Sequence, residues 1–158
     1  MEDRGRIFAL DNRCPHALPD TPEQSERRLT LIAMAQSGEF KSVRDTLWPL
    51  LVHLARHDDV ALKRAVFKMM DDTGPETFIR QQKAIISRPD SRPSLGMIQC
   101  PTLVLVGNGD ALIPVSVALT IADGITGSKL EIVQDCGHLS TIERPDAVTE
   151  ALRAWLDL

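Results

Sequence analysis

Two loop segments carry residue types suited to acid–base chemistry. Asp110 lies in the segment GNGDALIP, residues 107–114, and His138 lies in the segment DCGHLSTIERP, residues 135–145. A carboxylate that accepts a hydrogen bond from one imidazole nitrogen fixes the tautomer, so that the other nitrogen can take a proton from a hydroxyl nucleophile. The pair therefore predicts general acid–base chemistry, provided that the fold brings the two side chains together.

Each of these loops follows a segment with the character of a β-strand. Residues 102–107, TLVLVG, form an uninterrupted apolar run that is typical of a parallel strand covered on both faces, and residues 129–134, KLEIVQ, predict a second strand. Helices are expected over residues 115–122 and 145–156. Alternating strands and helices indicate a parallel sheet with crossover helices, which binds ligands at the carboxyl ends of its strands. Both loops should therefore lie at that edge.

The first half of the chain is expected to be mainly helical. A short apolar run at residues 6–10, RIFAL, predicts a strand that enters a proline-rich loop. Thr21 and Gln24 predict a capping box around Pro22, where the first helix begins. Apolar positions at helical spacing predict a second helix over residues 40–55.

Two more helices are expected before the sheet segments. Asp58 or Asp59 would cap the first of them, and Gly74 with Pro75 would close it and open the second. Residues 21–88 are therefore predicted to be helical throughout.

The C-terminal segment, residues 98–156, resembles the α/β-hydrolase family. The resemblance rests on I-x-C-P-T-L-V-L-V-G-x-x-D, then C-G-H-L-S, then E-R-P and a closing A-W-L helix. In that family the triad acid follows the penultimate strand and the histidine follows the last one, which implies Asp110 as the acid and His138 as the base. Residues 21–88 resemble the helical cap inserted in such enzymes, and residues 6–10 resemble the strand before it.

The resemblance implies an α/β fold class, namely the C-terminal portion of an α/β-hydrolase fold. It would contain a short parallel sheet with crossover helices and an inserted helical cap. We expect one domain over residues 1–158, truncated at its N-terminus, with the cap at 21–88 and the core at 98–158. The sheet is expected to be a three-stranded parallel remnant built from residues 6–10, 102–107 and 129–134.

The sequence contains neither a G-x-S-x-G elbow nor an HGGG segment, which in the family carry the nucleophile and the oxyanion site. Cys136 stands in the same loop as His138 and is poorly placed to attack a substrate. The resemblance implies hydrolysis of an apolar ester, lactone or related carbonyl compound once an N-terminal half completes the site. It implies no cofactor and no metal, and the isolated chain is expected to be inactive.

A non-catalytic role is the alternative. The chain could be a truncated product or a split half that associates with itself or with a partner chain, because an unpaired strand edge at residues 6–10 would recruit another strand. In that case Asp110 would be an ordinary turn aspartate that bonds its own loop, and His138 would be a loop histidine without a function.

Histidine and cysteine residues elsewhere give weaker signals. His53 and His57 have the i, i+4 spacing of zinc ligands, but the glutamate of H-E-x-x-H is missing, so a solvated helix face is preferred. Cys14 and His16 lack a partner pair and are assigned to a loop.

Large apolar side chains in the helical region could line a pocket beneath the cap, although helix packing is the preferred role. These residues are Trp48, Met69, Met70 and Phe78. Glu143 and Arg144 are expected to begin the last helix and not to bind anything.

Composition excludes several classes of partner. The 18 basic and 22 acidic residues give a net charge of -4, and the basic residues are scattered, so nucleic acid is not expected as a partner. No apolar run approaches the ~20 residues of a membrane span, and no signal peptide is evident, which predicts a cytoplasmic protein. Three cysteines at wide spacings predict reduced thiols.

Overall fold

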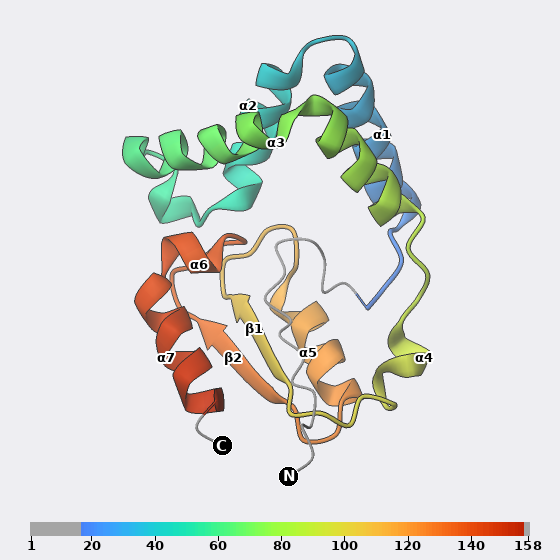
Figure 1. The fold of residues 1–158 in the computed structure, drawn as a ribbon, viewed down its shortest axis with the longest axis vertical. Helices are drawn as coiled ribbons and strands as arrows, with labels where there is room; N and C mark the ends of the chain where they lie inside the picture. Colours follow the sequence, from blue (N-terminus) through green and yellow to red (C-terminus); the bar gives the residue numbers. More distant parts are fainter. Residues whose placement is uncertain (1–16, 157–158) are drawn as a thin grey trace.

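A computed structural model describes residues 17–156 of the chain, so the expected strand at residues 6–10 and the pair Cys14 and His16 lie outside the described residues. Helices of the first half lie over the carboxyl ends of two parallel strands (Figure 1). We call residues 22–86 the helical half and residues 92–156 the C-terminal half. The elements are α1 (Pro22–Gln36), α2 (Phe40–Leu51), η1 (Leu54–Arg56), α3 (Val60–Ile86), α4 (Arg92–Leu95), β1 (Leu103–Gly107), α5 (Val115–Gly124), β2 (Lys129–Val133), α6 (Ser140–Glu143) and α7 (Pro145–Leu156).

The predicted capping box at the start of α1 is confirmed. The Thr21 hydroxyl accepts a hydrogen bond from the Gln24 N–H at 3.3 Å, and the Gln24 side chain accepts one from the Thr21 N–H at 2.9 Å. Pro22 occupies the first turn, where a missing N–H has no cost. The helix ends just before Gly38, whose φ of 85° lies in the left-handed region that glycine adopts without strain.

The second helix ends earlier than predicted, at Leu51 instead of about residue 55. In a longer helix the Leu51 carbonyl would accept a bond from within the helix. Here it accepts bonds from the backbone N–H groups of His138 and Leu139, at 3.1 and 3.2 Å. Val52 is extended, and a short 3₁₀ helix, η1, follows it. A tertiary contact thus replaces the last helical turn that periodicity predicts.

The break predicted at Gly74 and Pro75 is confirmed as a kink within α3. Asp59 caps the start of this helix by accepting a bond from the Leu62 N–H at 2.9 Å. Gly74 has φ 73° and ψ 162°, which is not helical, and Pro75 then starts the second segment. The kink lets one element follow two directions across the top of the molecule (Figure 1).

Strands β1 and β2 pair in parallel, as predicted, with a register that runs from Leu103 opposite Lys129 to Gly107 opposite Val133. Helix α5 connects them, and α7 lies on the other side of the strands in Figure 1. Within residues 17–156 the sheet has two strands, so the third predicted strand is not among the described residues.

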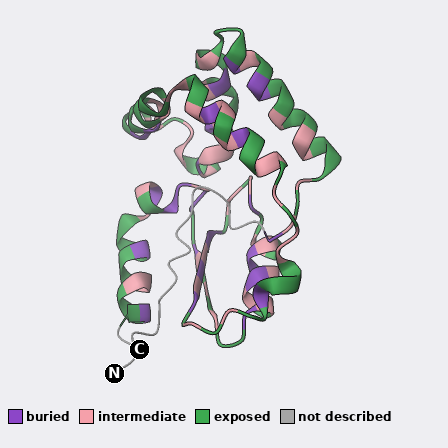
Figure 2. Cartoon of the chain, turned by 45° about the vertical axis from the view of Figure 1, so that its right-hand side comes forward, coloured by how far each residue is buried: buried purple, intermediate pink, exposed green. Residues whose placement is uncertain are grey.

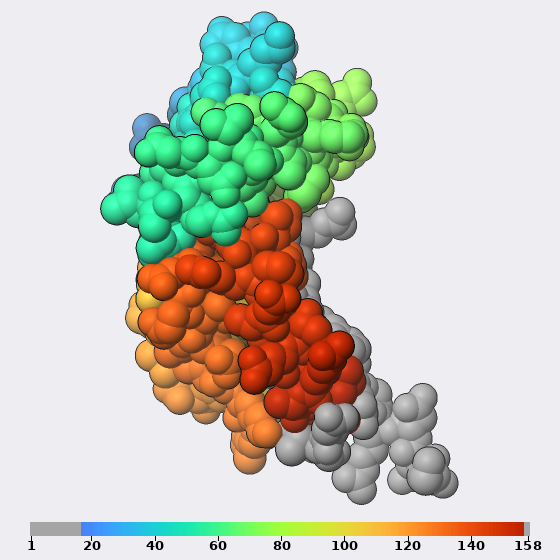
Figure 3. Space-filling model, turned by 90° about the vertical axis from the view of Figure 1, so that its left-hand side faces the viewer, coloured from blue at the N-terminus to red at the C-terminus, as the bar shows by residue number. Residues whose placement is uncertain are grey.

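Three clusters of buried apolar residues hold the elements together, and Figure 2 shows buried positions in purple in both halves. One surrounds β1 and α5, and another joins the three long helices. The third crosses between the halves, because Leu139 of the C-terminal half packs with residues of α2 and α3 such as Trp48 and Val66. Figure 3 shows the helical half seated directly on the C-terminal half. None of the helices in the described part of the chain has the length and apolar character that a membrane crossing requires.

Candidate active site

The structure brings Asp110 and His138 together at the carboxyl ends of the two strands. The Nδ1 atom of His138 lies 2.9 Å from Oδ2 of Asp110. Both side chains are largely shielded from water, with exposed fractions of 10% for His138 and 5% for Asp110. Shielding from water strengthens such a charge-assisted hydrogen bond.

Asp110 is also held by its own loop. Its Oδ1 atom accepts bonds from the backbone N–H groups of Leu112 at 2.8 Å and Ile113 at 2.9 Å, in the manner of a turn aspartate. The two interpretations given above for this residue are therefore compatible. One carboxylate oxygen fixes the loop, and this leaves the other oxygen aimed at the imidazole.

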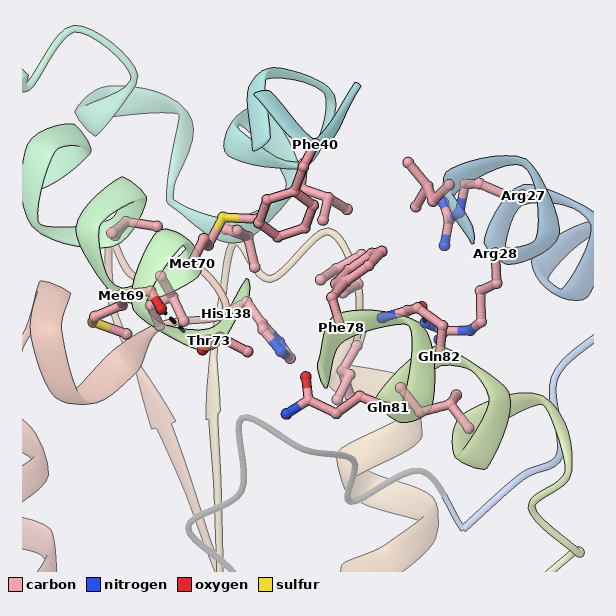
Figure 4. Close-up of a pocket in the computed structure, with 18 residues that line it drawn as sticks. Arg27, Arg28, Phe40, Met69, Met70, Thr73, Phe78, Gln81, Gln82 and His138 are labelled. Atoms are coloured by element: carbon pink, nitrogen blue, oxygen red, sulfur yellow. Dashed lines mark hydrogen bonds between the residues drawn. The ribbon is translucent and has the colours of Figure 1, made fainter. Parts of the chain in front are cut away.

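A backbone hydrogen bond positions His138, and its Nε2 atom is accessible from a cavity. Its N–H donates to the Leu51 carbonyl at 3.1 Å, and the imidazole reaches into a cavity between the two halves (Figure 4). Within residues 17–156 no hydrogen bond engages Nε2. That nitrogen is therefore available to a ligand in the cavity.

Two glycines allow the loops to approach so closely. A side chain at Gly107 would collide with the backbone carbonyls of Cys136 and Gly137. A Cβ at Gly137 would lie 2.5 Å from the His53 nitrogen and 2.5 Å from the Val52 carbonyl carbon. We call residues 135–145 the histidine loop. The contact between this loop and the end of α2 therefore depends on glycine at position 137.

Glu143 plays a part that the sequence reasoning missed. The last helix begins at Pro145, and Glu143 instead ends the short helix α6, with 3% of the residue exposed. Its two carboxylate oxygens accept bonds from the backbone N–H groups of Gly137 at 2.9 Å and His53 at 2.7 Å. The expectation that Glu143 begins the last helix is wrong, because a separate short helix, α6, precedes it and places the Glu143 side chain in the interior.

Arg144, paired with Glu143 in that expectation, is also not in the last helix. It caps α6, and its Nε donates to the Asp135 carbonyl at 3.0 Å. The E-R-P motif that ends the histidine loop was the available signal for both residues. Its pattern alone does not reveal which way the glutamate points.

Cys136 has no access to a substrate. The residue is fully buried, and burial raises the pKa of its thiol from 9.0 to about 12, with the Glu143 charge as the second cause. A thiol that keeps its proton is a poor nucleophile. Cys100 and Cys136 are both free thiols, as predicted.

His53 and His57 do not share a helix face, so that part of the expectation is wrong. They flank η1, where the His53 Nδ1 accepts a bond from the Ala55 N–H at 3.2 Å, and the His57 Nε2 lies 3.3 Å from the Val52 carbonyl oxygen. Across residues 17–156 no cluster of three or more potential metal-binding side chains occurs.

The cavity beside His138 has a volume of about 390 Å³, which is within the range of small-molecule sites. Met69, Met70 and Phe78 line it, although helix packing was the preferred role for them. Phe78 is also buried against α1 and α2, so it serves both purposes. Trp48 is buried in the cluster between the halves and does not contribute to the lining.

Comparisons with known proteins agree on the family. A family model described as the alpha/beta hydrolase fold matches residues 16–145. A proline iminopeptidase of Lactobacillus crispatus is 44% identical over 63 residues, which are 40% of this chain and 21% of that protein. A 2-hydroxy-6-oxononadienedioate/2-hydroxy-6-oxononatrienedioate hydrolase of Klebsiella pneumoniae is 38% identical over 68 residues, 43% of this chain and 24% of that protein.

Solved structures give the same picture over a longer stretch. A thermophilic esterase from Thermogutta terrifontis superimposes with a TM-score of 0.82 at 30% identity, and covers 89% of this chain and 52% of its own. The enol-lactonase from Burkholderia xenovorans LB400 gives a TM-score of 0.74 at 25% identity, with 90% and 54% covered. The chain thus spans about half the length of these solved relatives. It belongs to the α/β-hydrolase fold family.

Proposed function

We propose that this chain carries the acid and the base of a hydrolase that acts on esters, lactones or related carbonyl compounds. The observation that supports it is the largely shielded Asp110–His138 hydrogen bond of 2.9 Å, with the second imidazole nitrogen open to the cavity. Asp110 holds the imidazole in the tautomer with a proton on Nδ1. His138 then accepts a proton at Nε2 from a hydroxyl nucleophile and returns it to the leaving group.

The nucleophile would come from another segment or another chain. The sequence has no G-x-S-x-G elbow, and Cys136 is protonated and buried. In this proposal residues 21–88 act as a cap, and the substrate carbonyl lies below it beside His138. The esterase and the enol-lactonase among the structural relatives act on bonds of the proposed class, which supports the choice of reaction.

A second candidate is a non-catalytic half that binds a partner chain. The missing elbow is the observation that favours it. Light scattering distinguishes the two in part, since a chain built to pair should form dimers or larger species at micromolar concentration. A monodisperse monomer would argue against this second role.

The hydrogen bond itself can be tested on the chain as it exists. A ¹⁵N-correlated NMR spectrum of the imidazoles should show His138 with its proton on Nδ1, and Asp110→Asn should change that tautomer. The matched control is Asp123→Asn, an exposed aspartate on α5.

Activity is then tested by completing the site. The chain alone should hydrolyse p-nitrophenyl butyrate no faster than a His138→Ala variant does. Fusion to the N-terminal half of the Thermogutta terrifontis esterase should create turnover that His138→Ala removes. Equal turnover in the fused His138→Ala protein would refute the assigned base.

A further inference from the structure

Positive charge gathers at one end of the cavity that His138 lines. Arg27 and Arg28 of α1 both contribute to the lining, and none of the described residues around the cavity is an aspartate or a glutamate. Guanidinium groups at the edge of a cavity whose lining holds no carboxylate create a potential that attracts anions.

Arg28 is partly neutralised by a buried carboxylate. Its Nε donates to Asp20 at 2.6 Å, and its Nη1 donates to the Gln82 side-chain oxygen at 2.9 Å. The Asp20 carboxylate is only 2% exposed and also lies 3.7 Å from Arg88. One negative charge thus faces two guanidinium groups, so this cluster keeps a net positive charge behind the cavity wall.

Arg27 has no such partner among residues 17–156. Within the described residues it takes part in no ion pair and no side-chain hydrogen bond, and Glu23, one helical turn before it, does not pair with it. Arg27 is exposed and contributes to the cavity lining, so its guanidinium group can meet a ligand there.

The two arginines and the two methionines of the cavity lining lie at opposite ends (Figure 4). In Figure 4 the two arginines lie on one side of His138 and Met69 and Met70 lie on the other. Gln81 projects between them from α3. A ligand whose carbonyl is beside His138 would therefore have its apolar part toward the methionines and its polar end toward α1.

We infer that the cavity selects substrates that carry a carboxylate group remote from the reacting carbonyl, with Arg27 as the residue that binds this anion. The inference rests on the proposed function and specifies its substrate class. The Arg27 guanidinium group and the Gln81 amide supply enough donors for the two oxygens of a carboxylate. An anionic ester would thus bind with its reacting carbonyl at His138 and its charge at the α1 end.

The test is a binding measurement, so it does not require turnover. Isothermal titration of the purified chain with monomethyl adipate and with dimethyl adipate compares two ligands that differ by one negative charge. The monoester should bind about tenfold more tightly, as expected of a charge-assisted hydrogen bond at a partly exposed site. Arg27→Gln should remove this preference, and Arg27→Lys should keep part of it because the charge remains.

Arg80→Gln is the matched control, since Arg80 is an exposed arginine of α3 that donates to Thr77 and does not line the cavity. It changes the net charge equally and should preserve the preference. Thermal melting curves should show that each of these exposed substitutions leaves the chain folded.

Several results would overturn the inference. These are equal affinity for both ligands, tighter binding of the diester, binding of neither, or the same loss in Arg80→Gln as in Arg27→Gln. His138→Ala should retain the charge preference, because anion binding needs no proton transfer. A preserved preference in a site that proves inactive after fusion would leave anion binding intact and contradict only the proposed hydrolysis.

Discussion

The Glu143 carboxylate accepts a hydrogen bond of 2.9 Å from the backbone N–H of Gly137, the residue directly before His138. The same carboxylate accepts a second bond from the His53 N–H, at the start of η1. One buried side chain therefore ties the histidine loop to the helical half. This relationship makes Glu143 a positioning residue, because it acts on the imidazole only through the backbone.

Replacing Glu143 with glutamine should destabilise the protein by about 1–3 kcal/mol. The amide would have to turn its NH₂ group toward one of the two backbone N–H donors, which leaves that buried donor without an acceptor. Urea unfolding measures the loss, and amide exchange should accelerate at Gly137 and His53. Glu150→Gln is the control, as Glu150 is exposed on α7. Unchanged exchange at both amides would show that the carboxylate does not hold the loop.

Gly137→Ala should cost more than about 2 kcal/mol of stability, since the added methyl group would meet backbone atoms of Val52 and His53 that cannot move aside alone. Gly96→Ala is a suitable comparison, because the nearest atom to its Cβ is 4.0 Å away and its φ of -65° suits any residue. Similar midpoints for the two variants in chemical denaturation would mean that the close approach is not required.

Asp110→Asn should reduce the turnover of the completed enzyme by a factor on the order of 10⁴, by analogy with triads in which the amide stabilises the wrong imidazole tautomer. The KM value should change much less, because Asp110 contacts the imidazole and its own loop but does not line the cavity. Asp123→Asn should have no effect on either constant. A higher KM with an unchanged turnover number would instead indicate that Asp110 binds substrate.

The Cys136 thiol should make the free energy of unfolding depend on pH in the alkaline range. Its pKa is raised from 9.0 to about 12 in the folded chain, so the unfolded thiol loses its proton first as the pH increases. This contribution to stability is complete below about pH 9 and is lost as the pH rises toward 12. Urea unfolding between pH 7.5 and 10.5 should show a decline that Cys136→Ala reduces and Cys100→Ala does not. Parallel declines in all three proteins would contradict the assignment to Cys136.

The sequence predicts those parts of the site that depend on strand order. A branched apolar run before Asp110 and a second strand before His138 place both loops at one sheet edge, since parallel strands share their direction. The capping box at Thr21 and the break at Gly74 are also predictable, because each depends on neighbouring residues alone.

Contacts between distant segments could not be predicted in this way. Periodicity continues α2 beyond Leu51, but the backbone of His138 takes the Leu51 carbonyl and ends the helix. The inward turn of Glu143 depends on Gly137 in the same segment and on His53, which is 90 residues away along the chain. Arg27 of α1 lines the cavity together with residues from both segments of the kinked α3, such as Met70 and Phe78, and no local pattern shows that arrangement.

The shared carbonyl of Leu51 also sets the mechanics of the cavity. Because it accepts bonds from two successive residues of the histidine loop, the helical half cannot lift away from His138 without breaking both. The two halves that enclose the cavity are thus fixed to each other at the end where His138 lies. A ligand would therefore enter from the α1 side of the cavity, where the guanidinium group of Arg27 lies.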